Sequence, residues 1–502
     1  MRRIVTRKLL IGISTVGIVS LAMALRGEIE TMIAWWMAIM LLLPPLLWAQ
    51  KNRYVSLKII CFLAFMTQFV SLPFFYFDRD KFPWNHVKPF GFTALEAWPI
   101  LSKVTLFLVF LIVFFKLLYR LRIFGGSSNP LYDIAHIPAE KPIETTFIGE
   151  KAHYLKPSRY SRFYGFFIVL VIISIVPLNL WMYSQGISIV GVQAPKLPYK
   201  LSGLLHYLAV FVIPLLLGFL YWRSKRNLFL VMILLCYALL LGLTTISRFA
   251  LLIVMLPILA FAWLDQRRWL LIFSGTIAVV GFAVVSLARN FVYLVAGDEV
   301  IADTSKSIPT IIGDLFAQTD SPFLEGDFLV RMFVGIFDRI DGFGNLVMSR
   351  FYDPNAVLSP LGFLLRMICR PFAPMDVDLH HIQWQGDMLP FGFYNGGALL
   401  SNAVILGNAG LLWIVASALV AAFMLVLVEK NAYSVTVSYG LSELFSSALI
   451  GFLSIVFFIE TGGSITFLAP LILLIMANLL SPVFRLIRSK SSSTIARRTH
   501  NT

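Results

Sequence analysis

The sequence predicts an all-α membrane helix bundle of about twelve transmembrane helices, with a large, partly helical extracytoplasmic loop between helices 9 and 10. Apolar residues make up 59% of the 502 residues and charged residues only 13%, whereas soluble domains are about 45–50% apolar and about 25% charged. The apolar residues gather in stretches close to the roughly 20 residues that a spanning helix needs. Lys and Arg concentrate in alternate connecting segments, as membrane topology requires.

The predicted spans are 9–25, 31–49, 55–77, 97–118, 163–183, 204–222, 228–246, 249–264, 269–288, 411–428, 441–459 and 466–484. The seventh and eighth are divided only by Ser247-Arg248, so this pair is the least certain in number. Met1-Arg2-Arg3 precedes an apolar stretch without a convincing cleavage site, and we expect an uncleaved first helix.

Lys and Arg orient the chain, because they are retained on the cytoplasmic side. With both termini cytoplasmic, most of the 41 basic residues lie inside, and acidic residues outnumber basic ones outside. This topology and anionic lipid headgroups explain the net charge of +15, so nucleic acid need not be invoked as a partner. The predicted organisation is helices 1–9 in 1–288 with a cytoplasmic loop at 119–162, the extracytoplasmic loop 289–410, helices 10–12 in 411–484, and a cytoplasmic tail at 485–502.

The loop 289–410 is too long and too apolar for a simple linker. Amphipathic pieces occur at Ile311–Phe316 and Phe328–Ile340, and apolar stretches at Leu361–Met367 and Leu389–Leu406. We expect short helices that lie on the membrane surface or dip into it and cap the bundle. Only Cys369 of the three cysteines is outside, so no outside disulfide is expected, and no Cys/His spacing indicates a metal site.

Charges within the predicted spans are nearly absent, which disfavours ion-coupled transport and favours a site at the outer interface. Arg248 lies in a tight outside hairpin, where a guanidinium at headgroup depth could bind phosphate through two hydrogen bonds. Arg289 ends helix 9 in a similar position. The alternative for both residues is a side chain that only extends to the interface.

Further candidates lie in the outside loop. Arg331 and Arg339 are eight residues apart, about 80° around a helix, with Gly335 between them, so they could flank a pyrophosphate. Charge pairing with Asp338 is the alternative. His380 and His381 could act as a general base on a sugar hydroxyl, or belong to a solvated polar loop. Asp376, Asp378 and Asp387 could orient the imidazole, and the loop also contains Arg350, Arg366 and Arg370.

The layout resembles that of the O-antigen polymerase family, the polymerases of oligosaccharide repeat units. The similarity rests on about twelve helices, on Ser247-Arg248 at the outer end of a hairpin, on the large outside loop and on a Gly-rich return at Gly407–Gly410. The family is associated with arginines followed by ten residues and a glycine, and Arg331 and Gly342 have this spacing. Arg248 departs from it, since position 259 is Leu.

The resemblance implies a glycosyltransferase of the bacterial inner membrane that acts at its periplasmic face. A glycan on undecaprenyl pyrophosphate would move to the non-reducing end of another lipid-linked unit. Arg248, Arg289, Arg331 and Arg339 would bind the pyrophosphate, and His380, His381 and Arg331 would serve catalysis. No cofactor or metal is implied; the partners are the lipid-linked oligosaccharides and membrane lipids, and binding of a chain-length regulator stays open.

Four other functions are alternatives at this point, and the sequence disfavours the last two. An O-antigen ligase would use a similar fold and the His pair to transfer the glycan to lipid A core. A lipid-linked glycan flippase would be expected to show internal repeats and cations in a central cavity. Glycosyltransferases that use lipid-phosphosugars usually carry acids in a long first outside loop, which here is only 26–30. A pure scaffold is disfavoured by the size of the outside loop.

Overall fold

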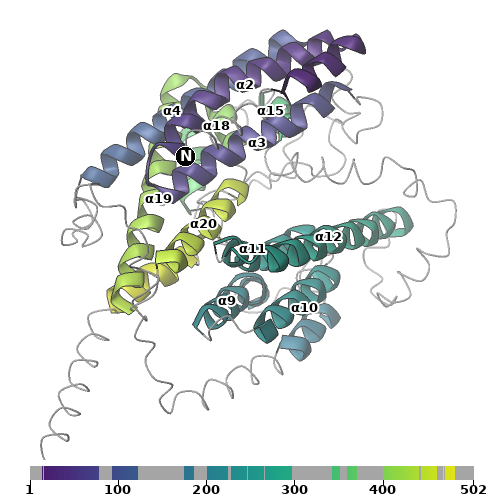
Figure 1. Ribbon diagram of the computed structural model, residues 1–502. Coiled ribbons are helices and arrows are strands. Elements are labelled where there is room, and N and C mark those ends of the chain that lie inside the picture. Colours follow the sequence, from purple (N-terminus) through teal and green to yellow (C-terminus); the bar gives the residue numbers. More distant parts are fainter. Residues whose placement is uncertain are drawn as a thin grey trace, which may run out of the picture. The chain divides into compact units, whose positions relative to one another are not determined.

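The computed structural model describes helical segments throughout the chain (Figure 1). The described residues are 14, 16–77, 93–121, 175–185, 201–223, 228–245, 247–264, 266–296, 342–350, 359–369, 399–439, 443–460, 467, 468 and 470–480. Within these ranges the secondary structure is helical and contains no strand, which confirms the predicted all-α class.

Six helices are long and apolar enough to cross a membrane, judged among the described residues. They are α2 (Ile29–Gln50), α3 (Val55–Phe77), α4 (Ala94–Arg120), α10 (Leu228–Thr245), α12 (Arg268–Ala296) and α19 (Leu411–Tyr439). Shorter apolar helices at Val16–Leu25, Ala250–Leu259, Phe445–Ile459 and Pro470–Leu480 fall within four other predicted spans. The chain thus has the helices of a multi-pass membrane protein.

Large apolar side chains remain exposed along these helices. On α2 they include Ile33 and Met40, the latter 70% exposed, and on α12 they include Trp269 and Ile272. A soluble monomer rarely exposes contiguous apolar surface of this extent, whereas lipid covers it without cost. These faces therefore support a bundle in contact with lipid.

The chain forms two compact units. Unit 1 comprises Met1–Lys116, Leu259–Leu271 and Gln318–Thr502, and unit 2 comprises Leu117–Ile258 and Ile272–Ala317.

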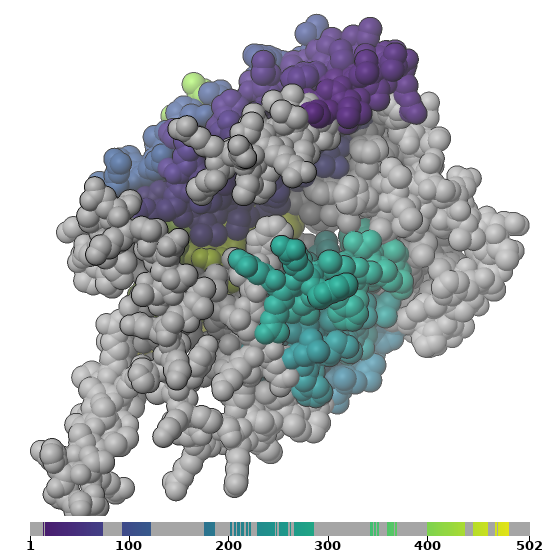
Figure 2. Space-filling model, viewed as in Figure 1, coloured from purple at the N-terminus to yellow at the C-terminus, as the bar shows by residue number. Residues whose placement is uncertain are grey.

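The core of unit 1 is built on α3, which packs against α2, α19 and α20 (Glu443–Glu460). Trp35 of α2 stacks on Phe69 of α3 with ring centroids 4.9 Å apart, and its indole Nε1 donates to the Phe69 carbonyl at 2.9 Å. Figure 2 shows the purple atoms of the N-terminal helices, α2 and α3 among them, on the face in view. Gly451 lets α20 approach α3 closely, since a Cβ there would lie 3.2 Å from Ile59 Cδ1.

Three short helices come from the predicted outside loop, namely α15 (Phe343–Arg350), α17 (Pro360–Cys369) and α18 (Leu399–Asn408). Within unit 1, α15 packs on α3 and α18, and α17 packs on α18 and α19. Residues Leu399–Leu406 of α18 are all buried, whereas α17 keeps Leu361 and Leu365 about half exposed. Two segments that were predicted to belong to the outside loop, α15 and α18, are therefore core helices of unit 1, and α17 lies at its surface.

A serine of α3 caps the buried N-terminus of α15. The Phe343 backbone N–H donates to Ser71 Oγ at 2.7 Å, and both residues are buried. The first N–H groups of a helix lack partners within that helix, and an unpaired one is costly where water is absent. Ser71 removes this cost and fixes where the loop helix enters the bundle.

Two helices extend beyond the predicted spans. Helix α12 continues to Ala296, although the span was predicted to end at 288, so the first residues of the predicted loop are helical. Helix α19 continues to Tyr439 past the predicted end at 428. Both predictions ended where the first charged residue appears, but a charge ends a hydrophobic stretch without ending backbone hydrogen bonding.

Unit 2 is built from α8 (Leu201–Tyr207), a π-helical turn η3 (Leu208–Val212), α9 (Ile213–Arg223), α10 and the parts of α11 (Arg248–Leu264) and α12 that fall in it. Helix α10 supplies a hydrogen bond to the backbone of the π-helical turn, since the Tyr237 hydroxyl donates to the Ala209 carbonyl at 2.7 Å. The seventh and eighth predicted spans thus correspond to two separate helices, α10 and α11, which are divided near Ser247.

Two glycines allow α10, α11 and α12 to pack closely. A Cβ at Gly242 would lie 3.1 Å from Leu251 Cβ and 3.3 Å from Val285 Cγ2. A Cβ at Gly281 would lie 2.9 Å from Leu239 Cδ2 and 3.2 Å from Leu251 Cδ2. Leu251 of α11 therefore sits between a glycine of α10 and a glycine of α12.

This packing predicts that Gly281→Val destabilises the protein by about 1–3 kcal/mol, the usual cost of overpacking a filled core. Gly275→Val on the same helix is the control, since nothing lies within 4 Å of a Cβ there. Both variants share the change in helix propensity. Thermal unfolding of the detergent-solubilised protein measures the effect, and equal midpoints for the two variants would contradict the close packing.

Candidate functional site

The α10–α11 turn positions Arg248 at the start of a helix. Ser247 Oγ accepts a hydrogen bond from the Ala250 N–H at 3.2 Å, which makes Ser247 the N-cap of α11. The Ser247 N–H donates to the Gly242 carbonyl at 3.2 Å and closes the end of α10. Arg248 is therefore the first helical residue of α11, at the hairpin end of unit 2.

Arg289 reaches the same end of unit 2 on α12. Leu239 of α10 contacts Gly281 of α12. Three residues further along α10, Gly242 contacts Val285, which is four residues further along α12. Because the contacts advance together along both helices, α10 and α12 run parallel. One further turn brings α10 to Thr245, at the hairpin, and α12 to Arg289.

Two arginine positions thus share one end of the three-helix packing. Each stands about one helical turn beyond the contact between Gly242, Leu251 and Val285. Arginine carries a permanent charge and five N–H donors, and its planar fork matches the oxygens of phosphate or carboxylate. The arrangement can bind an anion at the hairpin end.

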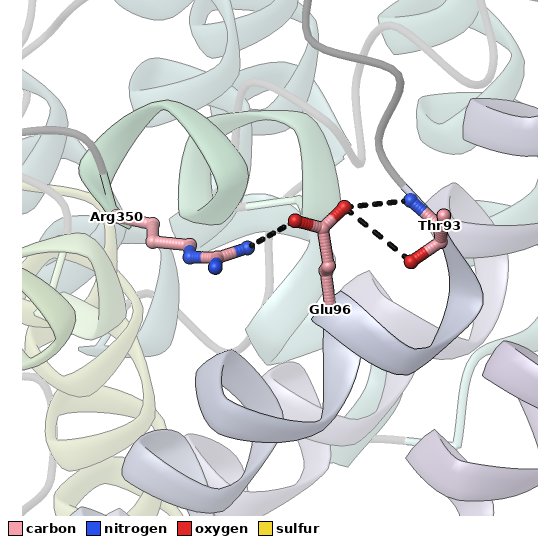
Figure 3. Close-up of polar contacts among 3 residues, drawn as sticks. All are labelled: Thr93, Glu96 and Arg350. Carbon is pink, nitrogen blue, oxygen red and sulfur yellow. Dashed lines mark hydrogen bonds and ion pairs between the residues drawn. The ribbon is translucent and has the colours of Figure 1, made fainter.

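A second group of charges lies at the N-terminal end of α4 in unit 1 (Figure 3). Glu96 Oε2 accepts from the Thr93 backbone N–H at 2.8 Å and from the Thr93 hydroxyl at 3.4 Å, so Glu96 caps its own helix. Glu96 Oε1 pairs with Arg350 Nη1 at 3.4 Å. Since Arg350 is the last residue of α15, this ion pair ties the loop helix to α4.

Asn408 connects the same ion pair to a buried part of α4. Its Nδ2 donates to the carbonyls of Ser349 and Arg350 at 3.0 and 3.1 Å. Its Oδ1 accepts from Lys103 Nζ at 2.6 Å. One amide therefore holds the C-terminal end of α15, the last residue of α18 and the third turn of α4 together.

The residues predicted from the sequence have different outcomes. Arg248 and Arg289 are placed at one end of unit 2 by their backbones, and Arg350 is paired with Glu96 in unit 1. Arg366 belongs to α17. Arg331, Arg339, Arg370, His380 and His381 lie outside the described residues. Among the residues that the structure describes, no group of three or more His, Cys, Asp or Glu side chains could hold a metal ion.

The prediction that charges are nearly absent within the spans overlooked Lys103. This lysine lies about 14 Å along α4 from Ala94, well inside an apolar helix. Glu96 was overlooked as well, although Thr93-Ala94-Leu95-Glu96 before an apolar run is the pattern of a capping box. That pattern would have identified the carboxylate that anchors Arg350.

Unit 1 also contains a buried carboxylate that joins two of its helices, α19 and α3. Glu429 of α19 is fully buried, and its Oε1 accepts from both the N–H and the hydroxyl of Ser56 at 2.9 Å. Ser56 is the second residue of α3, so the carboxylate satisfies an N-terminal N–H of that helix. Both residues lie near the cytoplasmic ends of their predicted spans, whereas Glu96, Arg350 and Asn408 lie near predicted outer ends.

This contact predicts that Glu429→Ala destabilises the protein by about 2–4 kcal/mol, because it leaves the buried Ser56 N–H and hydroxyl without an acceptor. Glu429→Gln keeps a side-chain oxygen and is expected to lose less than half as much. Thermal unfolding in detergent measures both variants. A Gln variant as unstable as the Ala variant would show that the oxygen's hydrogen bonds are not what matters.

The comparisons with known proteins give no relative for the chain. No protein-family model matches it, and neither a curated protein nor a solved structure matches significantly.

Proposed function

We propose that the chain is a polymerase of lipid-linked oligosaccharide repeat units. In this reaction the glycosyl–phosphate bond of a glycan on undecaprenyl pyrophosphate breaks, and the anomeric carbon bonds to a hydroxyl at the non-reducing end of another lipid-linked unit. Undecaprenyl pyrophosphate leaves, and the hydroxyl proton passes to a base. The glycan donor is already activated, so the protein must mainly position two lipids and stabilise a departing anion.

The observation that carries the proposal is the placement of Arg248 and Arg289 at one end of unit 2. Two arginines on separate, closely packed helices can hold the two phosphates of a leaving pyrophosphate without rearrangement of the backbone. The rigid packing around Leu251 favours such preorganisation. The proposal gives further pyrophosphate contacts to Arg331 and Arg339 and the role of base to His380 or His381, as the family resemblance implies.

The proposed topology places this end of unit 2 at the periplasmic face of the bacterial inner membrane. This topology has about twelve spans, cytoplasmic termini and the outside loop 289–410. It puts the arginines in the same membrane as the lipid-linked glycans, at the face where these would be joined. The apolar helices of both units support a membrane location.

The proposal predicts that Arg248→Ala or Arg289→Ala lowers the rate of polymer formation about 100-fold or more, the usual cost of losing one donor to a developing anion. Arg248→Lys should retain part of the rate, since it keeps the charge but not the bidentate fork. The matched control is Arg268→Ala, an exposed arginine at the opposite end of α12 from Arg289. Glycan ladders from cells with equal amounts of each variant provide the measurement.

A deletion strain distinguishes the rival functions. Caps with a single repeat unit indicate loss of a polymerase. Polymer left on the carrier lipid indicates loss of a ligase, and repeat units retained on the cytoplasmic side indicate loss of a flippase. Normal ladders from both arginine variants would contradict the assignment of this site.

A further inference from the structure

The C-terminal parts of α2 and α4 lie side by side in unit 1. The Thr105 hydroxyl oxygen of α4 lies 3.3 Å from the Leu41 carbonyl oxygen of α2. Further along both helices, the Lys116 ammonium lies 4.7 Å from the centroid of the Trp48 ring. Because the two contacts advance together along the sequence, α2 and α4 run parallel, and Trp48 and Lys116 both stand near the ends of their helices.

Two lysines are gathered around one aromatic side chain at this end. Lys116 lies over the face of Trp48, within the distance at which a cation and an aromatic ring attract. Lys51 follows Trp48 by three residues and has helical dihedral angles, φ −70° and ψ −15°, so the two Cβ atoms are about 5–6 Å apart. Trp48 thus joins both lysines into one group, which we call the Trp48 cluster (Trp48, Lys51 and Lys116).

The ammonium groups of the Trp48 cluster have donors to spare. In the part of the chain that the structure describes, neither lysine is paired with a carboxylate. The last carbonyls of α2 do not need them, since the Leu47 carbonyl accepts from the Lys51 backbone N–H at 3.3 Å and the Trp48 carbonyl from Asn52 Nδ2 at 2.8 Å. An ammonium has three N–H groups, so the cluster can bind an added acceptor.

The cluster borders apolar surface. Leu47, next to Trp48, is 53% exposed, and Val113, one turn before Lys116, is 42% exposed. Trp48 itself keeps more than a third of its surface exposed. Tryptophan is typical of the level of the lipid headgroups, and lysines near helix ends extend to the same level. A ligand at the cluster would therefore meet two cations beside a surface that suits hydrocarbon chains.

We propose that the Trp48 cluster binds the phosphate of an anionic phospholipid. The two ammonium groups donate to the phosphate oxygens, and the acyl chains cover Leu47 and Val113. A free anion would use the cations but not the apolar surface, so a lipid fits the arrangement better. The predicted topology puts this end at the cytoplasmic face, where anionic lipids attract basic residues. The proposal goes beyond the proposed polymerase activity and uses none of its residues.

The test measures lipid binding to the full chain purified in dodecyl maltoside. Thermal unfolding is followed while phosphatidylglycerol is added, with phosphatidylcholine of the same acyl chains as the lipid without net charge. A ligand that binds the folded state raises the unfolding midpoint according to its concentration and affinity. Phosphatidylglycerol should raise the midpoint more than phosphatidylcholine. Lys116→Met should weaken its binding about ten-fold, and Lys116→Arg should largely retain it, because the charge over the ring is kept.

Lys430→Met is the matched control, since it removes the same charge from α19, whose main packing partners are α3, α17, α18 and α20. It should leave the affinity for phosphatidylglycerol unchanged. Lysines at helix C-terminal ends also complement the helix dipole. That role affects the midpoint without lipid rather than the rise that lipid causes, so the affinity isolates the lipid contact. Inorganic phosphate, titrated separately, should not reproduce the effect of phosphatidylglycerol.

Four results would overturn the proposal: unchanged affinity in Lys116→Met, equal weakening by Lys430→Met, no greater stabilisation by phosphatidylglycerol than by phosphatidylcholine, or equal stabilisation by inorganic phosphate, which would indicate a free-anion site. If Lys116→Met fails to fold, Lys51→Met takes its place, and unchanged affinity in that variant would also overturn it. No step of this test involves glycan transfer, so its failure would leave the proposed polymerase activity to be judged on its own experiment.

Discussion

The side-chain amide of Asn408 is the contact that joins α15, α18 and the N-terminal half of α4 in unit 1. It donates to two carbonyls at the C-terminal end of α15 and accepts one hydrogen bond from the Lys103 ammonium. In a lipid environment an unpaired carbonyl or ammonium costs several kcal/mol, since no water can replace the missing partner. This constraint makes a single residue sufficient to align a loop helix, a core helix and a spanning helix.

The same constraint explains the other polar contacts of the bundle. Ser71 caps α15, Glu429 satisfies the start of α3, and the Tyr237 hydroxyl satisfies a carbonyl beside a π-helical turn. Each joins an element to one distant in the sequence, so polar residues specify which helices meet while apolar residues supply the packing. Buried polar groups in membrane bundles commonly serve in this way.

The sequence predicted the all-α class and the positions of the long apolar helices well, because a run of apolar residues is a local signal. It predicted helix ends less well. The tenth span was predicted to end at 428, yet Glu429 is buried inside α19. Its role as the acceptor for Ser56 joins residues far apart in sequence and gives no local signal. Lys103 was missed because hydropathy averages over a window and hides one charge among many apolar neighbours.

For the candidate sites, the hairpin arginine Arg248 could be identified from the sequence, since Ser247-Arg248 interrupts two apolar stretches. That Arg289 shares its end of unit 2 could not, because this follows from the register between Gly242 and Val285. The pairing of Arg350 with Glu96, 254 residues away in sequence, was equally beyond local patterns. Of this pair, only Glu96 has a local sequence signal, the capping box that begins at Thr93.

The central claim is that the cations of the hairpin turn face the outside of the membrane. A cysteine introduced by Ser247→Cys, in a chain whose Cys61, Cys236 and Cys369 are replaced by Ser or Ala, tests it directly with a membrane-impermeant maleimide on intact cells whose outer membrane has been permeabilised. Asn52→Cys, in the predicted cytoplasmic turn between α2 and α3, is the paired position. The account predicts labelling at 247 without lysis and at 52 only after lysis. The reverse pattern would place the arginines on the cytoplasmic side and contradict it.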